Sequence, residues 1–419
     1  MQEDAHLQQG RKAQGGLRKE TPASPGDMGR QFVLRVTYLL TAVEFTCLFM
    51  QFSILPYLAK DLGLDSVGFG YLQTLFGVLQ LLGGPIFGRF ADQWGARAAL
   101  TLSFVAASGF YLLLSFATNV PLLVASRIPA MFMHALPGAQ MVITDMTPPA
   151  DRPAALGKLG LCFGIGIILG SLLGGTLNSN LYSPAYVAFL ANTICTMISL
   201  SCIPANTKAT SEAETAPSGT PPAASVFDLK EIARLLGLPG VRPVFFIKIL
   251  SGFPSGLFMI MFSIISMNFF ELEAAQAGYL MSYFGVLQMV VQGLVIGQLT
   301  ERYSEDTLLR ASVFVFSSVG LAMVRLAVPW LLPSLCAFTL PPRSSLVTHS
   351  LSYSTLRRAM LGICASVQPL TRTIGPTIGG LLYKSFGVAA FGHLQFAVNF
   401  LLFLYLCKKS VPQKVKKAP

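Results

Sequence analysis

Long apolar stretches alternate with short polar segments along the whole chain. An α-helix rises about 1.5 Å per residue, so a stretch of about twenty residues crosses the roughly 30 Å hydrocarbon core of a bilayer. The pattern therefore predicts membrane-spanning helices in two groups of six. The first group covers residues 31–58, 69–88, 98–117, 122–144, 155–177 and 185–204, and the second covers 243–267, 277–299, 308–328, 329–340, 359–383 and 388–406.

The tenth stretch breaks this pattern. Residues 329–340 reach only about 18 Å as a helix, and residues 341–358 carry two prolines and four basic side chains, counting His349, with no apolar run able to span. Two readings stay open: residues 329–358 form a re-entrant segment, or the chain is a variant product whose tenth span is damaged. We favour the second because both flanks resume the apolar pattern. A damaged span puts transport competence itself in question.

The composition divides the chain into five parts. These are a polar cytosolic tail at 1–30, a six-helix bundle at 31–204, a cytosolic linker at 205–242, a second helix bundle at 243–406 and a basic cytosolic tail at 407–419. The linker opens with a stretch rich in Pro, Ser, Thr and Ala, which cannot build a packed core. At 226–238, apolar residues recur at helical spacing opposite charged ones, which predicts an amphipathic helix on the membrane surface. A plain soluble linker helix is nearly as well supported.

The composition excludes an ordinary soluble protein. Hydrophobic residues make up 53% of the chain and charged residues only 12%, about half the charged fraction of soluble domains. The net charge of +11 has a topogenic explanation, because Lys and Arg gather in the short segments that the positive-inside rule assigns to the cytosol. We therefore expect both termini in the cytosol and no nucleic-acid partner. The plasma membrane, including an apical surface, and internal membranes both stay open as locations.

Cysteine usage and motif content argue against metal sites and catalysis. The seven cysteines lie mostly in apolar stretches without a metal-binding spacing, so we expect reduced thiols and no metal. No HExxH motif, catalytic carboxylate pair or nucleophile elbow occurs, so we do not expect an enzyme. The expected partners are a small-molecule substrate and membrane lipids.

The two groups of helices contain an internal repeat. Residues 70–80 read GYLQTLFGVLQ and residues 278–288 read GYLMSYFGVLQ, with eight of eleven positions identical at an offset of 208 (278 − 70). Further on, GSLLGG at 170–175 corresponds to GPTIGG at 375–380, at an offset of 205 (375 − 170). Two like halves that rock about a central cavity are the architecture of many transporters. The repeat is the strongest sequence argument for transport.

A polar turn follows the second predicted span. It resembles the GxxxD[RK]xG[RK][RK] loop of the major facilitator superfamily, matching at Gly88, Asp92, Gly95 and Arg97 and departing from it at Gln93 and Ala96. The resemblance implies a conformational latch between helix ends, with Asp145 at the end of the fourth span as the partner of the basic residue. An ordinary cytosolic turn is the alternative.

A second family motif concerns small residues in the fifth and eleventh spans. The fifth span resembles the GxxxGPxxGG antiporter motif through Gly166, Gly170, Ser171, Gly174 and Gly175, with Ser171 in place of the proline. The eleventh span retains the proline within Gly375, Pro376, Gly379 and Gly380. Small residues on one face let two helices approach closely. The resemblance implies a hinge, and tight packing without a hinge is the alternative.

Taken together, these motifs make the chain resemble the drug and proton antiporters of the major facilitator superfamily. More narrowly, FMQFSILPYL and SVFDLKEIARLL are similar to an organic cation transporter-like branch of solute carrier family 22. The resemblance covers nearly the whole chain. It implies an all-α membrane protein with the major facilitator fold, that is, two pseudo-symmetric six-helix bundles with about twelve spans.

Glu44 is the chief ionisable residue inside a predicted span. A charge at the bilayer centre costs about 2.5–3.5 kcal/mol on insertion scales, so desolvation favours the neutral, protonated carboxyl. A carboxyl neutralised either by a proton or by a cationic substrate is a minimal exchanger. The alternative is a permanent structural pair with Arg127. His134, seven residues after Arg127 and hence on the same helical face, is a candidate proton relay, and a structural histidine is its alternative.

We therefore predict a secondary active transporter. It exports organic cations of the lipophilic amine type in exchange for protons by alternating access, with the proton as coupling ion and no other cofactor. Two other functions stay open, namely a non-transporting membrane scaffold or receptor that keeps the fold, and a uniporter of a neutral solute.

Overall fold

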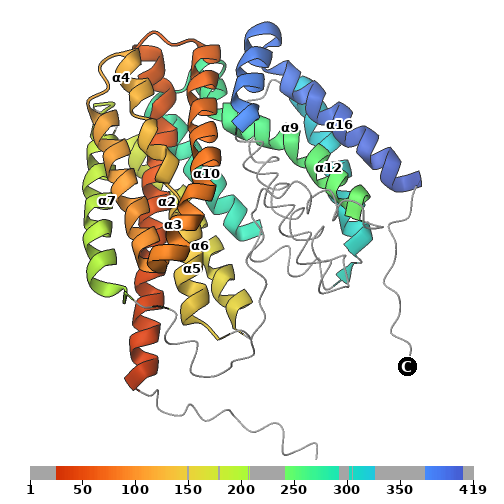
Figure 1. The fold of residues 1–419 in the computed structure, drawn as a ribbon. Helices are drawn as coiled ribbons and strands as arrows, with labels where there is room; N and C mark the ends of the chain where they lie inside the picture. Colours follow the sequence, from red (N-terminus) through yellow and green to blue (C-terminus); the bar gives the residue numbers. More distant parts are fainter. Residues whose placement is uncertain are drawn as a thin grey trace, which may run out of the picture.

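The structure is a computed structural model that describes residues 25–148, 151–177, 180–205, 207, 241–291, 302–303, 305–325 and 373–408. All regular structure in these residues is helical (Figure 1). Several predicted features lie outside the described residues, namely both outer tails at 1–24 and 409–419, the linker at 208–240, and the tenth stretch at 329–358.

The described helices coincide with predicted spans. In the first half they are α2 (Pro25–Asp61), α3 (Ser66–Ser115), α4 (Val120–Ala125), the 3₁₀ helix η1 (Ile128–Phe132), α5 (Ala135–Met146), α6 (Arg152–Thr176) and α7 (Ser183–Cys202). In the second half they are α9 (Val241–Asn268), α10 (Ala274–Val290), α12 (Glu305–Arg325), a helical segment at 373–386 and α16 (Ala389–Lys408). Within the described part of the chain, seven helical stretches are long and apolar enough to cross a membrane.

The longest helix, α3, contains two spans rather than one. Its 50 residues include Gly95, whose backbone has φ +83° and ψ 170°. An L-residue with a side chain is strained at this φ, so glycine is the residue that lets the chain reverse between the second and third predicted spans. The backbone conformation therefore explains why the family motif has glycine at position 95.

Side-chain caps fix where helices begin after the turns. Asp65 precedes α3, and its Oδ1 accepts a hydrogen bond of 2.8 Å from the Gly68 N–H. Asn119 precedes α4 and accepts 2.9 Å from the Leu122 N–H, with Pro121 in the first turn. Both caps satisfy backbone donors that a helix start leaves unpaired.

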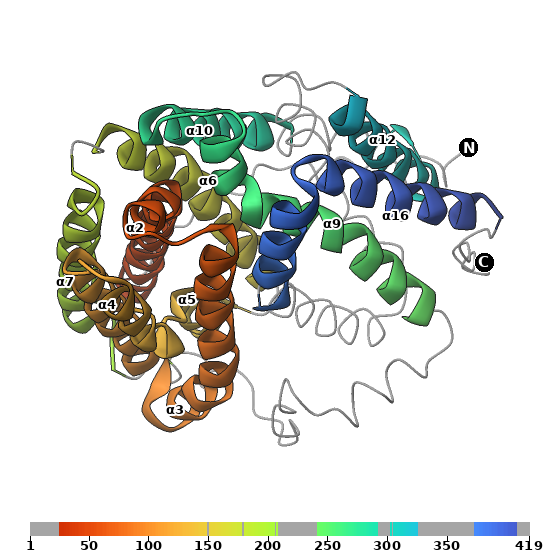
Figure 2. The same cartoon turned by 90° about the horizontal axis from the view of Figure 1, so that it is seen from above.

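The two halves lie side by side. Seen from above, α2 to α7 form one group and α9, α12 and α16 the other, while α10 lies along α6 of the first group (Figure 2). A continuous apolar core joins α2 and α3 to α9. We call the end of the molecule that carries Asp65 the Asp65 end, and the opposite end, where α3 reverses at Gly95, the Gly95 end.

The fourth predicted span is interrupted, which corrects the expectation of one continuous helix at 122–144. The helix α4 ends at Ala125, η1 follows, and α5 starts only after His134, whose φ −124° and ψ 47° are not helical. His134 therefore does not share a helical face with Arg127, contrary to the prediction. Against this interruption, α3 supplies the Gln80 side chain, whose Nε2 donates 3.1 Å to the Met133 carbonyl oxygen.

Candidate functional site

Glu44 is buried inside the first half rather than turned to the surrounding lipid. Its side chain is 9% exposed, and its Oε2 has no hydrogen-bond partner among the described residues. The hydrogen-bonding neighbour of the carboxyl is Asn192 of α7. Glu44 thus faces the interior of the bundle formed by α2, α3 and α7.

A group of buried polar atoms surrounds this carboxyl. Asn192 uses its Nδ2 to donate 3.0 Å to the Ala188 carbonyl, and its Oδ1 has no partner within the described structure. The Tyr111 hydroxyl of α3 is also fully buried without such a partner. Tyr111 lies close enough to sense the charges of both Glu44 and Arg127. Neither Tyr111 nor Asn192 was predicted as a site residue, although both are polar residues within apolar spans.

Arg127 is completely buried at the interruption between α4 and η1. Its guanidinium carbon lies 4.9 Å from the centre of the Phe110 ring, within the range of a cation–π contact. In the described part of the chain, none of its three guanidinium nitrogens has a hydrogen-bond partner. No ion pair joins it to Glu44 there, so the described residues do not support the structural-pair alternative.

His134 packs against α3 instead of Glu44. Its ring centre lies 5.0 Å from that of Phe87, and its Nε2 lies 3.2 Å from the Met131 carbonyl oxygen. The structure therefore places Glu44 and Arg127 around Tyr111 and puts His134 in a different contact. A relay role for His134 stays a prediction.

The repeated segments pack across the boundary between the halves. A Cβ built on Gly70 of α3 would lie 2.5 Å from the Pro376 carbonyl oxygen, and one on Gly278 of α10 would lie 2.5 Å from the Ser171 carbonyl oxygen of α6. Gly70 and Gly278 are repeat counterparts, and so are Ser171 and Pro376. The duplication thus builds two equivalent close contacts, each of which joins one half to the other.

The other small residues of the antiporter-like motif divide between two kinds of contact. Gly175 approaches Ala275 of α10 and Gly380 approaches Ser66, so both join the halves. The remaining members pack within one half: Gly166, Gly170 and Gly174 lie against α2 at Phe45, Thr46 and Met50, and Gly379 lies against Met261 of α9. Gly375 lies in the same helical segment, 373–386. The close approach of neighbouring helices explains why glycine occupies these positions, whereas a hinge at the motif stays a prediction.

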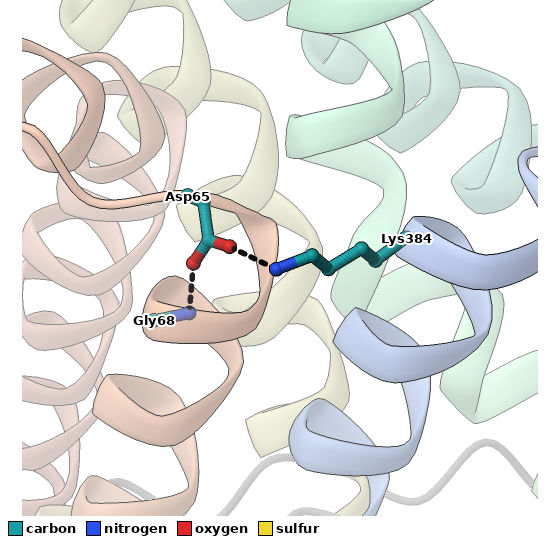
Figure 3. Close-up of polar contacts among 3 residues, drawn as sticks. All are labelled: Asp65, Gly68 and Lys384. Carbon is teal, nitrogen blue, oxygen red and sulfur yellow. Dashed lines mark hydrogen bonds and ion pairs between the residues drawn. The ribbon is translucent and has the colours of Figure 1, made fainter.

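Polar contacts reinforce the boundary at the Asp65 end. Lys384 Nζ lies 3.0 Å from Asp65 Oδ2 (Figure 3). The Thr74 and Thr377 hydroxyl oxygens are 2.7 Å apart, and the Tyr57 hydroxyl donates 2.7 Å to the Leu272 carbonyl. Asp65 has a pKa below its ordinary value, because its carboxylate accepts hydrogen bonds from the Gly68 N–H and from Lys384. This ion pair was not predicted from the sequence, because its partners are 319 residues apart.

The residues of the predicted latch lie at the Gly95 end without forming the expected pair. Asp92 is exposed and Arg97 is half-buried, while Gly88 faces open space. The half-buried Asp145 accepts a hydrogen bond of 2.5 Å from the Thr207 hydroxyl. Within the described residues no ion pair joins Arg97 to Asp145, so the latch stays a prediction. Metal-binding groups of three or more His, Cys, Asp or Glu side chains are also absent from the described part.

Comparisons with known proteins agree over most of the chain. The sequence profile of the Major Facilitator Superfamily matches residues 37–340 and 244–419. Solute carrier family 22 member 18 of Rattus norvegicus is 58% identical over 414 residues, covering 95% of this chain and 99% of the relative. The class H tetracycline resistance protein of Pasteurella multocida is 24% identical, covering 92% and 98%. The crystal structure of the human organic anion transporter MFSD10 (TETRAN) has a TM-score of 0.64 at 18% identity, covering 92% and 100%, and shows the same fold.

Two halves of membrane-spanning helices, in close contact through equivalent glycines, define the class of this protein. It is a polytopic membrane protein of the transporter type. The chain belongs to the Major Facilitator Superfamily. The predicted fold and the predicted resemblance to a branch of solute carrier family 22 are confirmed. Members of this superfamily are transporters, not enzymes, and generally need no cofactor.

Proposed function

We propose that this protein exchanges organic cations of the lipophilic amine type for protons, with Glu44 as the proton-binding residue. The observation that carries the proposal is the buried Glu44 carboxyl, whose Oε2 lacks a hydrogen-bond partner among the described residues. An ionised carboxylate would leave this oxygen as a buried, uncompensated charge, which is strongly unfavourable. A protonated carboxyl is neutral and supplies a donor to a surrounding that includes the unpaired Asn192 Oδ1.

The position of Glu44 favours an indirect coupling over direct competition at one carboxyl. Its neighbours Asn192 and Tyr111 belong to α7 and α3 of the same half. Loss of the proton would place a negative charge near Tyr111, which also senses the Arg127 charge. We therefore propose that deprotonation of Glu44 changes the electrostatic interactions of Tyr111 and Arg127 and thereby shifts the interrupted fourth span. This movement changes how the halves meet and thereby couples proton release to alternating access.

The two glycine contacts between repeat counterparts supply surfaces about which the halves can rock. We propose that the Gly95 end faces the cytosol, because α3 and α6 place Arg89, Arg97, Arg152 and Lys158 there. The cytosolic latch of Asp92, Arg97 and Asp145 would then engage in a conformation other than the described one, in which Thr207 binds Asp145.

Tracer uptake into proteoliposomes tests the proposal. Radiolabelled tetraethylammonium is a suitable probe, because its permanent charge prevents passive equilibration with a pH gradient. The full chain is expected to accumulate the probe when the vesicle interior is acidic, and Glu44→Gln is expected to abolish this pH-driven accumulation. Glu271→Gln, which neutralises an exposed loop carboxylate, is the matched control and should behave as the parent.

The outcomes separate the candidate functions. Equal gradient-driven uptake in the parent and in Glu44→Gln would contradict the role of Glu44. Probe entry that ignores the pH gradient in both would contradict proton exchange and favour uniport of the cation. No uptake by a folded parent protein, with permanently charged organic cations of several sizes, would favour the scaffold or receptor.

A further inference from the structure

A small cavity lies at the Asp65 end between the two halves. Its volume is about 280 Å³, close to the lower bound of ordinary ligand pockets, which are about 300–1,000 Å³. The walls come from α2 and α3 of the first half and from α9 of the second. Most of the lining is apolar and consists of Pro56, Ala59, Leu64, Phe69, Ile264 and Met267.

Asp65 is the acidic residue of the wall, beside the polar residues Lys60, Ser66 and Asn268. Its Oδ1 is held by the Gly68 N–H, and its Oδ2 faces the Lys384 ammonium (Figure 3). Both side chains of this ion pair are more than half exposed, at 55% and 63%. An exposed ion pair contributes only about 0–1 kcal/mol, so its cation is readily exchanged. Lys384 is itself a primary ammonium on a flexible alkyl stem, which is the chemistry of a small alkylamine.

We propose that this cavity binds a small alkylammonium compound, with its ammonium at Asp65 in place of Lys384 and its alkyl chain against the apolar wall. The site lies apart from Glu44 and goes beyond the proposed exchange. Because the wall belongs to both halves, the bound compound bridges α2 and α3 to α9, and these contacts replace the Asp65–Lys384 ion pair that the compound displaces. An alkylamine added on this side therefore acts as an inhibitor of the opening of the Asp65 end.

Lys60 is the other charged side chain on the wall. It lies in the last turn of α2, is exposed and precedes Asp61. Its ammonium repels a bound cation weakly, since surface charges are screened by water and salt. Lys60→Gln is therefore expected to tighten alkylamine binding modestly.

Binding of hexylamine to the full chain in lipid nanodiscs tests the proposal without requiring transport. Hexylamine should bind and raise the melting temperature, whereas hexanol, of equal chain length but uncharged, should not. Asp65→Asn retains a residue able to cap α3 but removes the charge, so it should weaken binding by up to about fivefold. Lys384→Met removes the competing ammonium and should tighten binding by up to about fivefold.

Tighter hexylamine binding by Lys384→Met would show that Lys384 competes with the ligand for Asp65. An ion pair with a structural role alone would not produce this gain. Ile264→Trp, which fills the cavity from α9, should abolish binding, while Glu44→Gln should bind hexylamine like the parent. Equal effects of hexylamine and hexanol, or unchanged affinity in Asp65→Asn and Lys384→Met, would overturn the site. Hexylamine binding does not require proton exchange, and Glu44→Gln tests this directly. Loss of the alkylamine site would therefore leave the proton-exchange proposal untouched, and the reverse also holds.

Discussion

The guanidinium carbon of Arg127 lies 4.9 Å from the centre of the Phe110 ring, at the point where the fourth span is interrupted. Within the described residues, two groups stabilise the guanidinium: the Phe110 ring and the nearby Tyr111. Its nitrogens have no hydrogen-bond partner there. A desolvated cation–π contact contributes about 2 kcal/mol, whereas burying an uncompensated ion costs several kcal/mol. Arg127 is therefore retained at a net cost to stability, which is a pattern typical of functional residues.

Arg127→Met should raise the thermal stability of the protein while lowering transport. The substitution removes a buried unpaired charge and keeps an apolar side chain of similar length, and replacing buried charges by packed apolar residues is neutral or stabilising by about 1–4 kcal/mol. Thermal unfolding in detergent gives the stability, and tetraethylammonium uptake gives the activity. If Arg127→Met instead lowers stability by several kcal/mol, Arg127 is a structural pair member and the coupling role is wrong.

Gly70→Ala and Gly278→Ala should have similar effects, because both glycines occupy equivalent contacts between the halves. Each added methyl group would collide with a carbonyl oxygen, of Pro376 or of Ser171, and overpacking of this kind costs about 1–3 kcal/mol. Melting temperatures of the two variants test this. The matched control is Gly160→Ala on α6, which meets no atom within 4 Å and should gain about 0.5–1 kcal/mol from helix propensity. Unequal effects of the two repeat variants would contradict the equivalence.

Gln80→Leu should destabilise the interrupted fourth span. The substitution removes the hydrogen bond to the Met133 carbonyl, and an unsatisfied buried acceptor costs about 1–3 kcal/mol. Gln288→Leu is the control, since Gln288 is the repeat counterpart of Gln80 on α10. Hydrogen exchange of residues 126–134 should accelerate in Gln80→Leu only. An identical exchange pattern in both variants would show that Gln80 does not support the interruption.

The Asp65–Lys384 pair should be insensitive to pH across the physiological range. The folded pKa of Asp65 is lowered, so its stabilising effect is present above the unfolded value of about 3.9 and is lost as pH falls through the folded value. The exposure of the pair limits the effect to about 0.2–1 kcal/mol. The stability difference between the parent and Asp65→Asn should therefore stay constant from pH 8 to pH 5. A difference that shrinks within that window would contradict the assignment.

The sequence predicted the features that depend on local pattern and duplication. Apolar length located the described spans, and the repeat of Gly70 at Gly278 indicated two like halves, whose contacts the structure then showed. Interactions between distant residues were not predictable in the same way. The interruption before His134 depends on Gln80 of another span, and the surroundings of Glu44 depend on Asn192 and Tyr111, so tertiary packing decides both.

Proton movement itself tests the central claim most directly. Proteoliposomes that contain a trapped pH-sensitive dye can report internal pH while radiolabelled tetraethylammonium enters. The account predicts that the interior becomes more alkaline as the probe enters through the parent protein, and that Glu44→Gln abolishes this linked proton exit. Probe entry through the parent without any change in internal pH, or equal proton exit in Glu44→Gln, would contradict it.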